Sequence, residues 1–105
     1  MAVTVLIKRK VSDGKGELLE NLYSELIALA VKQEGYLGAE TFRRLDVQDE
    51  YLVISRWRHV EDWSKWLVSE GRRGFQERID ALTDSHTKFE IYESTPSGKK
   101  KGKEM

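Results

Sequence analysis

The stretch Trp57-Arg-His-Val-Glu-Asp-Trp63-Ser-Lys-Trp66-Leu-Val-Ser69 contains all three tryptophans of the chain. Trp57 ends an apolar run that is typical of a strand, whereas Trp63 and Trp66 follow at helical spacing. Tryptophans cluster in this way when they build a core, a pocket or an interface, because each indole buries a large apolar area. The stretch therefore indicates a strand followed by a helix that packs near it.

Outward from this junction, the spacing of apolar residues alternates between the periods of strands and helices. The pattern predicts strands over residues 2–11, 36–45, 51–58 and 87–93, and helices over 17–34, 60–69 and 73–82. Gly35 is expected to stop the first helix, and Gly71 and Gly74 to interrupt the second helical region. The order β-α-β-β-α-β predicts an α+β, ferredoxin-like fold, with an antiparallel four-stranded sheet and helices on one face.

Two of the predicted strands are apolar on both faces. A sheet covered by helices on one side should alternate between apolar and polar residues. The first and third strands depart from this rule, with Val3, Val5 and Ile7 against Leu6, and Val53 and Trp57 against Leu52 and Ile54. The second face then needs a cover, for which another copy of the chain is the simplest candidate. We expect a homodimer with sheet packed on sheet.

Composition and charge narrow the class of protein. The 105 residues fit one domain, which we expect over residues 1–94, followed by a disordered, lysine-rich tail over residues 95–105. Formal net charge is zero, but the four lysines of the tail leave the body at about −3. A mildly acidic body argues against nucleic-acid binding.

Cysteines and long apolar runs are absent from the sequence. Without cysteine, the chain has no disulfide, no thiolate nucleophile and no cysteine-ligated metal. No run approaches the ~20 apolar residues of a membrane-spanning helix, and the N-terminus lacks the pattern of a signal peptide. We therefore expect a cytoplasmic protein without a membrane partner.

Several segments, in this order, resemble the antibiotic biosynthesis monooxygenase (ABM) family of dimeric α+β barrel proteins. They are Val3-Thr-Val-Leu-Ile-Lys-Arg-Lys-Val11, Gln33-Glu-Gly35-Tyr-Leu-Gly38-Ala-Glu40, Glu50-Tyr-Leu-Val-Ile-Ser-Arg-Trp57 and Glu61-Asp-Trp63-Ser-Lys-Trp66-Leu67. The resemblance covers about residues 2–93 and implies a homodimer with a pocket between helices and sheet. It does not imply one activity, because such proteins include cofactor-independent oxygenases of polycyclic aromatic compounds, haem-degrading monooxygenases, isomerases and quinol oxidases.

The haem-degrading branch can be tested residue by residue. Its members resemble this chain at Trp66, but the position of their iron-binding histidine falls on Gln76 and that of their asparagine near Ile7. Glutamine is a poor iron ligand beside imidazole. Haem degradation by that ligand set is therefore not expected, although haem binding through His86 or a tyrosine stays an alternative.

Eight residues are candidates for a substrate pocket, each with a plainer interpretation. Trp66 would stack on a flat substrate, or fill the core, and Trp63 lies on the same side of the helix. Phe75, Leu22 and Leu26 would line the pocket with apolar groups, or belong to the ordinary core. Tyr23 and Gln76 would orient a ligand through hydrogen bonds, or simply be solvated. His59 is a candidate base, or a cap on the surface. Two histidines without paired carboxylates predict no metal site.

These features favour a monooxygenase that needs no cofactor. A deprotonated phenolic or quinol-type substrate can pass an electron to dioxygen itself, so the protein need only supply a dry aromatic pocket and an orienting hydrogen bond. A non-catalytic domain that binds a small hydrophobic ligand, or a stress-associated one, is the main alternative hypothesis.

Overall fold

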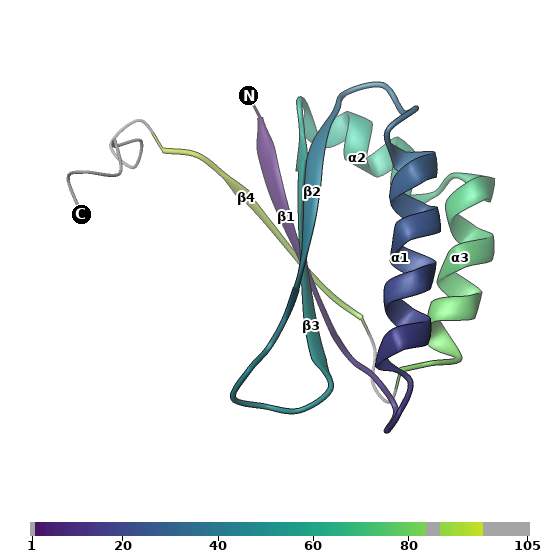
Figure 1. The fold of residues 1–105 in the computed structure, drawn as a ribbon. Coiled ribbons are helices and arrows are strands. Elements are labelled where there is room, and N and C mark those ends of the chain that lie inside the picture. Colours follow the sequence, from purple (N-terminus) through teal and green to yellow (C-terminus); the bar gives the residue numbers. More distant parts are fainter. Residues whose placement is uncertain (1, 84–86, 96–105) are drawn as a thin grey trace.

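The computed structural model describes residues 2–83 and 87–95, which form four strands and three helices (Figure 1). In order they are β1 (Val3–Lys10), α1 (Gly16–Ala30), β2 (Tyr36–Arg43), β3 (Glu50–Trp57), α2 (Val60–Leu67), α3 (Glu70–Asp80) and β4 (Lys88–Glu93). The predicted α+β, ferredoxin-like arrangement is confirmed. The expected tail lies outside the described residues from residue 96 onward.

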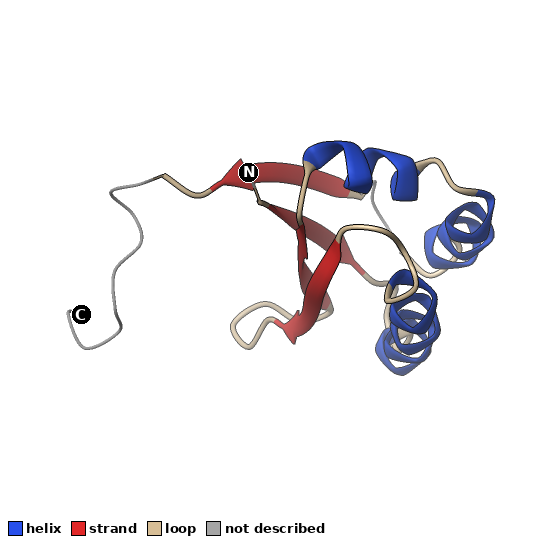
Figure 2. Ribbon diagram, turned by 90° about the horizontal axis from the view of Figure 1, so that it is seen from above, coloured by secondary structure: helices blue, strands red, loops and turns tan. Residues whose placement is uncertain are grey.

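The strands form one antiparallel sheet in the order β2-β3-β1-β4. Val3 lies opposite Trp57 of β3, and Val5 lies opposite both Ser55 of β3 and Ile91 of β4. Opposite residues share a face, so the odd-numbered residues of β1 lie on the same face as these partners. All three helices lie on this side of the sheet (Figures 1 and 2).

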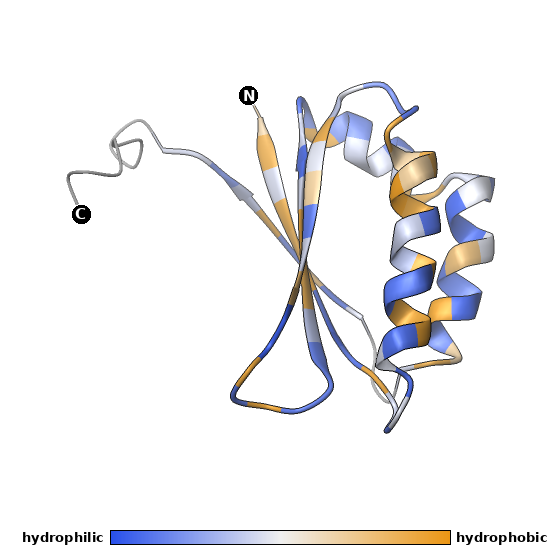
Figure 3. Ribbon diagram, in the orientation of Figure 1, coloured by the Kyte–Doolittle hydropathy of each residue, from blue (hydrophilic) through white to orange (hydrophobic). Residues whose placement is uncertain are grey.

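The core between helices and sheet consists of two adjoining clusters. One contains Val3, Val5, Ala30, Trp57, Trp63 and Trp66, and the other contains Val11, Leu19, Leu22, Tyr23, Tyr51, Val53 and Ile79. Burying one such large apolar side chain is worth about 1.5–3 kcal/mol. Buried residues of α1 and β3 belong to both clusters, and Figure 3 shows hydrophobic residues along β1 and α1.

The opposite face of the sheet has no helix over it and is partly apolar. Leu6 of β1 lies opposite Ile54 of β3, and Leu52 lies two residues from Ile54 on the same face. All three side chains are half-buried. Phe42 and Tyr92 on the outer strands are 41% and 50% exposed. The apolar character of both faces, predicted from the sequence, is therefore present in the structure. Below, this surface is called the open face.

The first helix is shorter than the sequence predicted. α1 ends at Ala30, whereas the apolar pattern extended it to Glu34. Its last turn tightens, because the N–H groups of Lys32 and Gln33 donate to the carbonyls of Leu29 and Ala30, three residues back, at 3.2 and 2.9 Å. Gly35 has a φ of 81° and begins the path into β2 after this turn, so it is not the residue that stops the helix.

The prediction that Gly71 and Gly74 interrupt the second helical region was wrong, because both lie inside α3. The break comes earlier, at Ser69, whose Oγ accepts a hydrogen bond from the Arg72 N–H at 3.4 Å. A serine in this position caps a new helix by satisfying one of its free N–H groups. The helix is therefore started by its cap, and its two glycines are tolerated within it.

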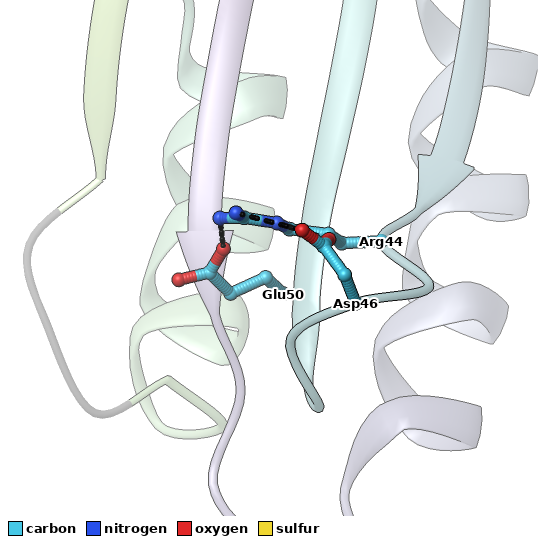
Figure 4. Close-up of polar contacts among 3 residues, drawn as sticks. All are labelled: Arg44, Asp46 and Glu50. Atoms are coloured by element: carbon cyan, nitrogen blue, oxygen red, sulfur yellow. Dashed lines mark hydrogen bonds and ion pairs between the residues drawn. The ribbon is translucent and has the colours of Figure 1, made fainter.

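A polar clamp closes the β2–β3 hairpin (Figure 4). Arg44 donates from Nε to Asp46 Oδ1 at 2.7 Å and from Nη1 to Glu50 Oε2 at 2.6 Å. The bond from Arg44 holds the pKa of the Asp46 carboxyl below its usual range. Asp49 takes up a left-handed conformation with φ 64°, which aspartate tolerates better than most residues. Because the ion pairs are exposed, they guide the turn more than they stabilise the fold.

Candidate functional site

Trp57 forms the centre of an aromatic group between the sheet and α2. It is 1% exposed, meets Tyr36 edge-on with ring centroids 5.4 Å apart, and stacks on Trp66 at 6.2 Å. Its indole Nε1 donates to Ser55 Oγ at 3.2 Å, so the polar atom of this buried ring has a partner. Trp66, predicted as a pocket wall, is 7% exposed and is packed by this contact.

Trp63 belongs to a second aromatic contact, nearer β4. Its ring meets Phe89 edge-on at 5.9 Å, and the guanidinium carbon of Arg72 lies 5.6 Å from the centre of the Phe89 ring. A guanidinium over a phenyl face gains a cation–π attraction. Arg72 is only 7% exposed, so a formal positive charge lies within the layer between helices and sheet.

Neutral groups hold Arg72 in place. Its Nη1 donates to the Leu67 carbonyl at 3.3 Å, and its Nη2 donates to Gln76 Oε1 at 2.8 Å. Gln76 in turn donates from Nε2 to Asp80 Oδ1 at 2.6 Å, so hydrogen bonds link Arg72 to this carboxylate through Gln76. Burial lowers the pKa of Arg72 to about 10, and the positive charge of Arg9 adds to this effect while Asp80 opposes it.

Arg9 is the second buried cation and is 4% exposed. It occupies an odd position of β1, so its side chain enters the layer under the helices. Nη1 donates to the Tyr23 hydroxyl at 2.8 Å and Nε donates to Thr87 Oγ1 at 3.0 Å. Across residues 2–83 and 87–95, no carboxylate forms an ion pair with Arg9 or Arg72. Buried charges usually have such a partner, so this interior is unusually electropositive.

A hollow of about 360 Å³ opens beside this layer, between α1 and the β2–β3 half of the sheet. Its lining comprises Glu20, Tyr23, Ser24 and Ile27 of α1 with Thr41, Arg43 and Tyr51 of the strands. The volume is at the low end of ligand pockets, roughly 300–1,000 Å³.

The polar groups of the hollow differ in how well they are partnered. The Tyr51 hydroxyl donates to Glu20 Oε2 at 3.1 Å, and burial together with this carboxylate raises the pKa of Tyr51. Arg43 Nη1 lies 3.9 Å from the same Glu20 oxygen. Thr41 Oγ1, by contrast, is buried and has no hydrogen-bond partner in the described chain. A buried hydroxyl without a protein partner is rare in native proteins.

The structure distributes the eight residues predicted for the pocket over several environments. Tyr23 lines the hollow, while Leu22 is buried and Leu26 partly buried in the core. Phe75 is half-buried, and the Arg78 guanidinium lies 5.3 Å from its ring centre. His59 is exposed at the start of α2 and makes no capping bond with its side chain. Trp63, Trp66 and Gln76 occupy the contacts described above.

Among the residues that the structure describes, no group of three or more His, Cys, Asp or Glu side chains could hold a metal ion. His86, the alternative haem ligand considered from the sequence, lies outside the described residues. No described helix is both long and apolar enough to cross a membrane.

Three residues of this region were not predicted from the sequence: Arg9, Thr41 and Tyr51. Arg9 follows Val3, Val5 and Ile7 at strand spacing, so a charged residue on the buried face could have been recognised. Thr41 gives no such signal, because threonine is common in strands on either face.

The family model for antibiotic biosynthesis monooxygenase matches residues 2–78 of this chain. This range covers most of the fold, from β1 into α3. No match was found among curated protein sequences.

Solved structures share the fold. The structure of SnoaB from Streptomyces nogalater, described as a cofactor-independent oxygenase, has a TM-score of 0.81 with 18% identity over 90% of this chain and 93% of that chain. A conserved protein from Methanosarcina mazei Go1 has a TM-score of 0.84 with 20% identity, over 90% and 94% of the two chains. Identities this low support the fold and leave the reaction to other arguments.

Proposed function

Because this chain belongs to the antibiotic biosynthesis monooxygenase family, we propose that it is a monooxygenase acting on a small phenolic or quinol-type substrate. The proposed binding place is the hollow between α1 and the β2–β3 half of the sheet. SnoaB, described as cofactor-independent, shares the fold, and we extend that mode of oxygen activation to this chain as part of the proposal.

One observation carries the choice of site: a hollow of ligand size is lined by Thr41, whose buried hydroxyl has no hydrogen-bond partner among the described residues. The same hollow brings two phenolic side chains, Tyr23 and Tyr51, next to the apolar Ile27. Aromatic and aliphatic walls with a few polar groups are the usual lining of small-molecule sites. A small phenol fits this combination, because its ring would contact the walls and its oxygen would meet the hydroxyls.

The reaction balances without an outside reductant if the substrate carries a CH₂ group beside its phenolic ring. Conversion of CH₂ to C=O with one molecule of O₂ releases one molecule of water, so one oxygen atom enters the product and the other leaves. The ionised phenol supplies the first electron to dioxygen, and the carbon radical and reduced oxygen then combine. The role of the protein is to hold the ring and exclude water from these reactive species.

Oxygen uptake with a panel of CH₂-flanked phenols and hydroquinones tests the activity. The proposal requires one O₂ consumed per product formed, with incorporation of one labelled oxygen atom from ¹⁸O₂. Absence of uptake together with tight binding of the same phenols would instead favour the ligand-binding alternative.

A pair of bulky substitutions tests the site. Ile27→Trp fills the hollow and should abolish uptake, whereas Val31→Trp, at a 56% exposed position just past α1, should leave it unchanged. Equal activity in the two variants would place the reaction elsewhere. Trp66→Phe, which keeps an aromatic ring against Trp57, then tests the sequence-based prediction that Trp66 contacts the substrate.

We further propose that two copies associate through the open face. Leu6, Leu52, Ile54, Phe42 and Tyr92 give this surface an apolar character that a partner would cover. Sedimentation equilibrium should give twice the 12.2 kDa of one chain. Ile54→Asp in the middle of the face should return the mass to that of one chain, whereas a wild-type protein that sediments as a single chain would refute the dimer.

A further inference from the structure

We propose that the open face carries a second ligand site at its hairpin end, for an organic anion with an apolar body. A hollow of about 460 Å³ opens there, and this volume is within the range of small-molecule sites. The side chains that define its character are Lys8, Lys10, Phe42, Leu52 and Lys88. Below, it is called the lysine hollow.

The strand register places these side chains in two neighbouring rows of the sheet. The first row crosses all four strands and consists of Lys88, Lys8, Leu52 and Phe42. Lys10 and Glu50 form the next row, at the end of the sheet nearer the β2–β3 hairpin. Residues that lie opposite one another share a face, and the even positions of β1 belong to the open face. The register therefore brings lysines and apolar side chains together on the side away from the helices.

Three other residues line the lysine hollow, but their polar groups lie on the helix side of the sheet. Arg9 donates to the Tyr23 hydroxyl there, while Arg43 and Tyr51 both meet Glu20. Arg43 and Tyr51 also border the hollow beside α1, because a single sheet separates the two hollows. The charged groups that a ligand would reach in the lysine hollow are therefore those of the even-numbered rows.

The lysines of these rows repel one another. Lys8 and Lys88 lie directly opposite on β1 and β4, and like charges in that arrangement destabilise a sheet. Lys10 follows two residues after Lys8 on the same face. Among the ion pairs of the described residues, Lys8 alone of the three has a carboxylate partner, Glu90 Oε1 at 3.0 Å. An anion bound between these ammonium groups would relieve the repulsion.

The carboxylates near the lysine hollow oppose an anion, but each has a cationic partner. Glu50 Oε2 accepts from Arg44 Nη1 at 2.6 Å, in the clamp that also contains Asp46 (Figure 4). Glu90 is paired with Lys8. The clamp carries one negative charge in excess and the Lys8 pair none, whereas Lys10 and Lys88 contribute two positive charges. The local balance is therefore positive, and it is most positive on the β1–β4 side.

The apolar part of the row determines the class of anion. Phe42 is 41% exposed and Leu52 is half-buried, so both offer apolar surface beside the ammonium groups. A small inorganic anion would use the charges only. A carboxylate or sulfonate carried on a ring system would also cover Phe42 and Leu52, and small-molecule sites commonly combine apolar walls with a few polar groups in this way.

The lysine hollow is compatible with the proposed dimer. A second copy would be centred on Leu6 and Ile54, which lie opposite each other in the row beyond Lys8. Lysine is depleted from the cores of protein interfaces, because a buried ammonium group needs a partner. We therefore expect the lysine end of the open face to lie at the rim of such an interface, where a ligand can reach it.

Titration of the wild-type protein with three small molecules tests the inference. Naphthalene-2-carboxylate has rings and a charge, naphthalene-2-carboxamide has the same rings without the charge, and acetate has the charge without the rings. The naphthoate should bind about tenfold more tightly than either of the others, and less tightly as salt is added. Equal binding of naphthoate and amide would overturn the inference, as would no binding of naphthoate.

Lysine variants locate the bound anion. Lys10→Gln and Lys88→Gln together should weaken naphthoate binding about five- to tenfold, since exposed ion pairs are individually weak, and should leave binding of the amide unchanged. Lys65→Gln is the matched control, because it removes an exposed lysine of α2 on the other side of the sheet. Naphthoate binding at full strength in the double variant, or an equal loss in Lys65→Gln, would refute the site.

Two further measurements separate this site from the other proposals. Ile27→Trp fills the hollow beside α1 and should leave naphthoate binding unchanged, whereas loss of binding would place the anion in that hollow. The sedimentation mass should be the same with and without saturating naphthoate. A lower mass in its presence would mean that a second copy fills the lysine hollow, which would overturn the inference. Failure of phenols to cause oxygen uptake would refute the oxygenase and leave this site unaffected.

Discussion

Replacement of Thr41 by valine should make the protein more stable. Thr41 Oγ1 is buried without a hydrogen-bond partner in the described chain, and such a group costs about 1–3 kcal/mol of folding free energy. Valine keeps the shape, suits a strand, and would face Val53 across the β2–β3 pair. We therefore expect the free energy of unfolding in urea to rise by about 1–3 kcal/mol, with unchanged dependence on urea concentration.

Thr4→Val is the matched control for this prediction. Thr4 is also a half-buried strand threonine, but it lies on the open face opposite Arg56 and Tyr92. With both substitutions made in the Ile54→Asp background, where the open face is not covered by a second copy, Thr4→Val should change the free energy of unfolding by only a few tenths of a kcal/mol. A loss of stability in Thr41→Val would refute the reasoning, because it would mean that the hydroxyl is satisfied in the native protein. A gain in stability accompanied by slower oxygen uptake is the combination expected of a residue kept for function.

Three further changes test other parts of the structure. Gly74→Ala should raise the free energy of unfolding by about 1 kcal/mol, since a Cβ there meets nothing within 4 Å. Gly71→Ala should raise it less, because its Cβ would lie 2.9 Å from Leu29 Cδ2. Equal gains in free energy of unfolding in urea titrations would contradict this packing. Burial raises the pKa of Tyr23 above 10.0, so its contribution to stability is complete below pH 10.0 and is lost as the pH rises through the raised folded value. Chemical unfolding between pH 9 and 12 should accordingly show a shallower alkaline loss for Tyr23→Phe than for the wild type, and parallel curves would argue against a buried hydroxyl. Arg44→Ala should leave the urea midpoint unchanged within error, because its ion pairs are exposed, and a clear drop would show that the hairpin clamp stabilises the fold.

The order of elements and the two faces of the sheet could be predicted because each depends on short-range periodicity. Val5 and Leu6 alternate in sequence, and the register places Val5 under the helices and Leu6 on the open face. Strand period alone carries this information. The contact between Trp57 and Trp66 likewise follows from a strand end that leads directly into a helix.

Helix ends were predicted less well because local signals compete there. Gly35 resembles a stop signal, yet α1 ends at Ala30 through backbone bonds that any sequence can make. Gly71 and Gly74 resemble breaks, but Ser69 supplies a cap before them and α3 continues through both. Which signal prevails depends on packing against the rest of the fold, and the sequence does not display that packing.

The candidate site depends on contacts between distant residues. Tyr23 was predicted as a polar candidate, but its partner Arg9 lies on a different element, 14 residues earlier in the chain. The hollow needs α1, β2 and β3 together, and only the folded arrangement shows that Thr41 Oγ1 has no partner among the described residues.

The sheet order also determines when this protein can fold during its synthesis. β1 leaves the ribosome first, but it occupies the interior of the sheet, between β3 and β4. Val3 pairs with Glu93, so one side of the first strand stays without a partner until almost the whole domain has been made. Pairings this distant in sequence slow folding and leave a strand edge free to associate with other chains. A nascent chain halted before β4 should therefore bind chaperones, and release of the last strand should end that binding.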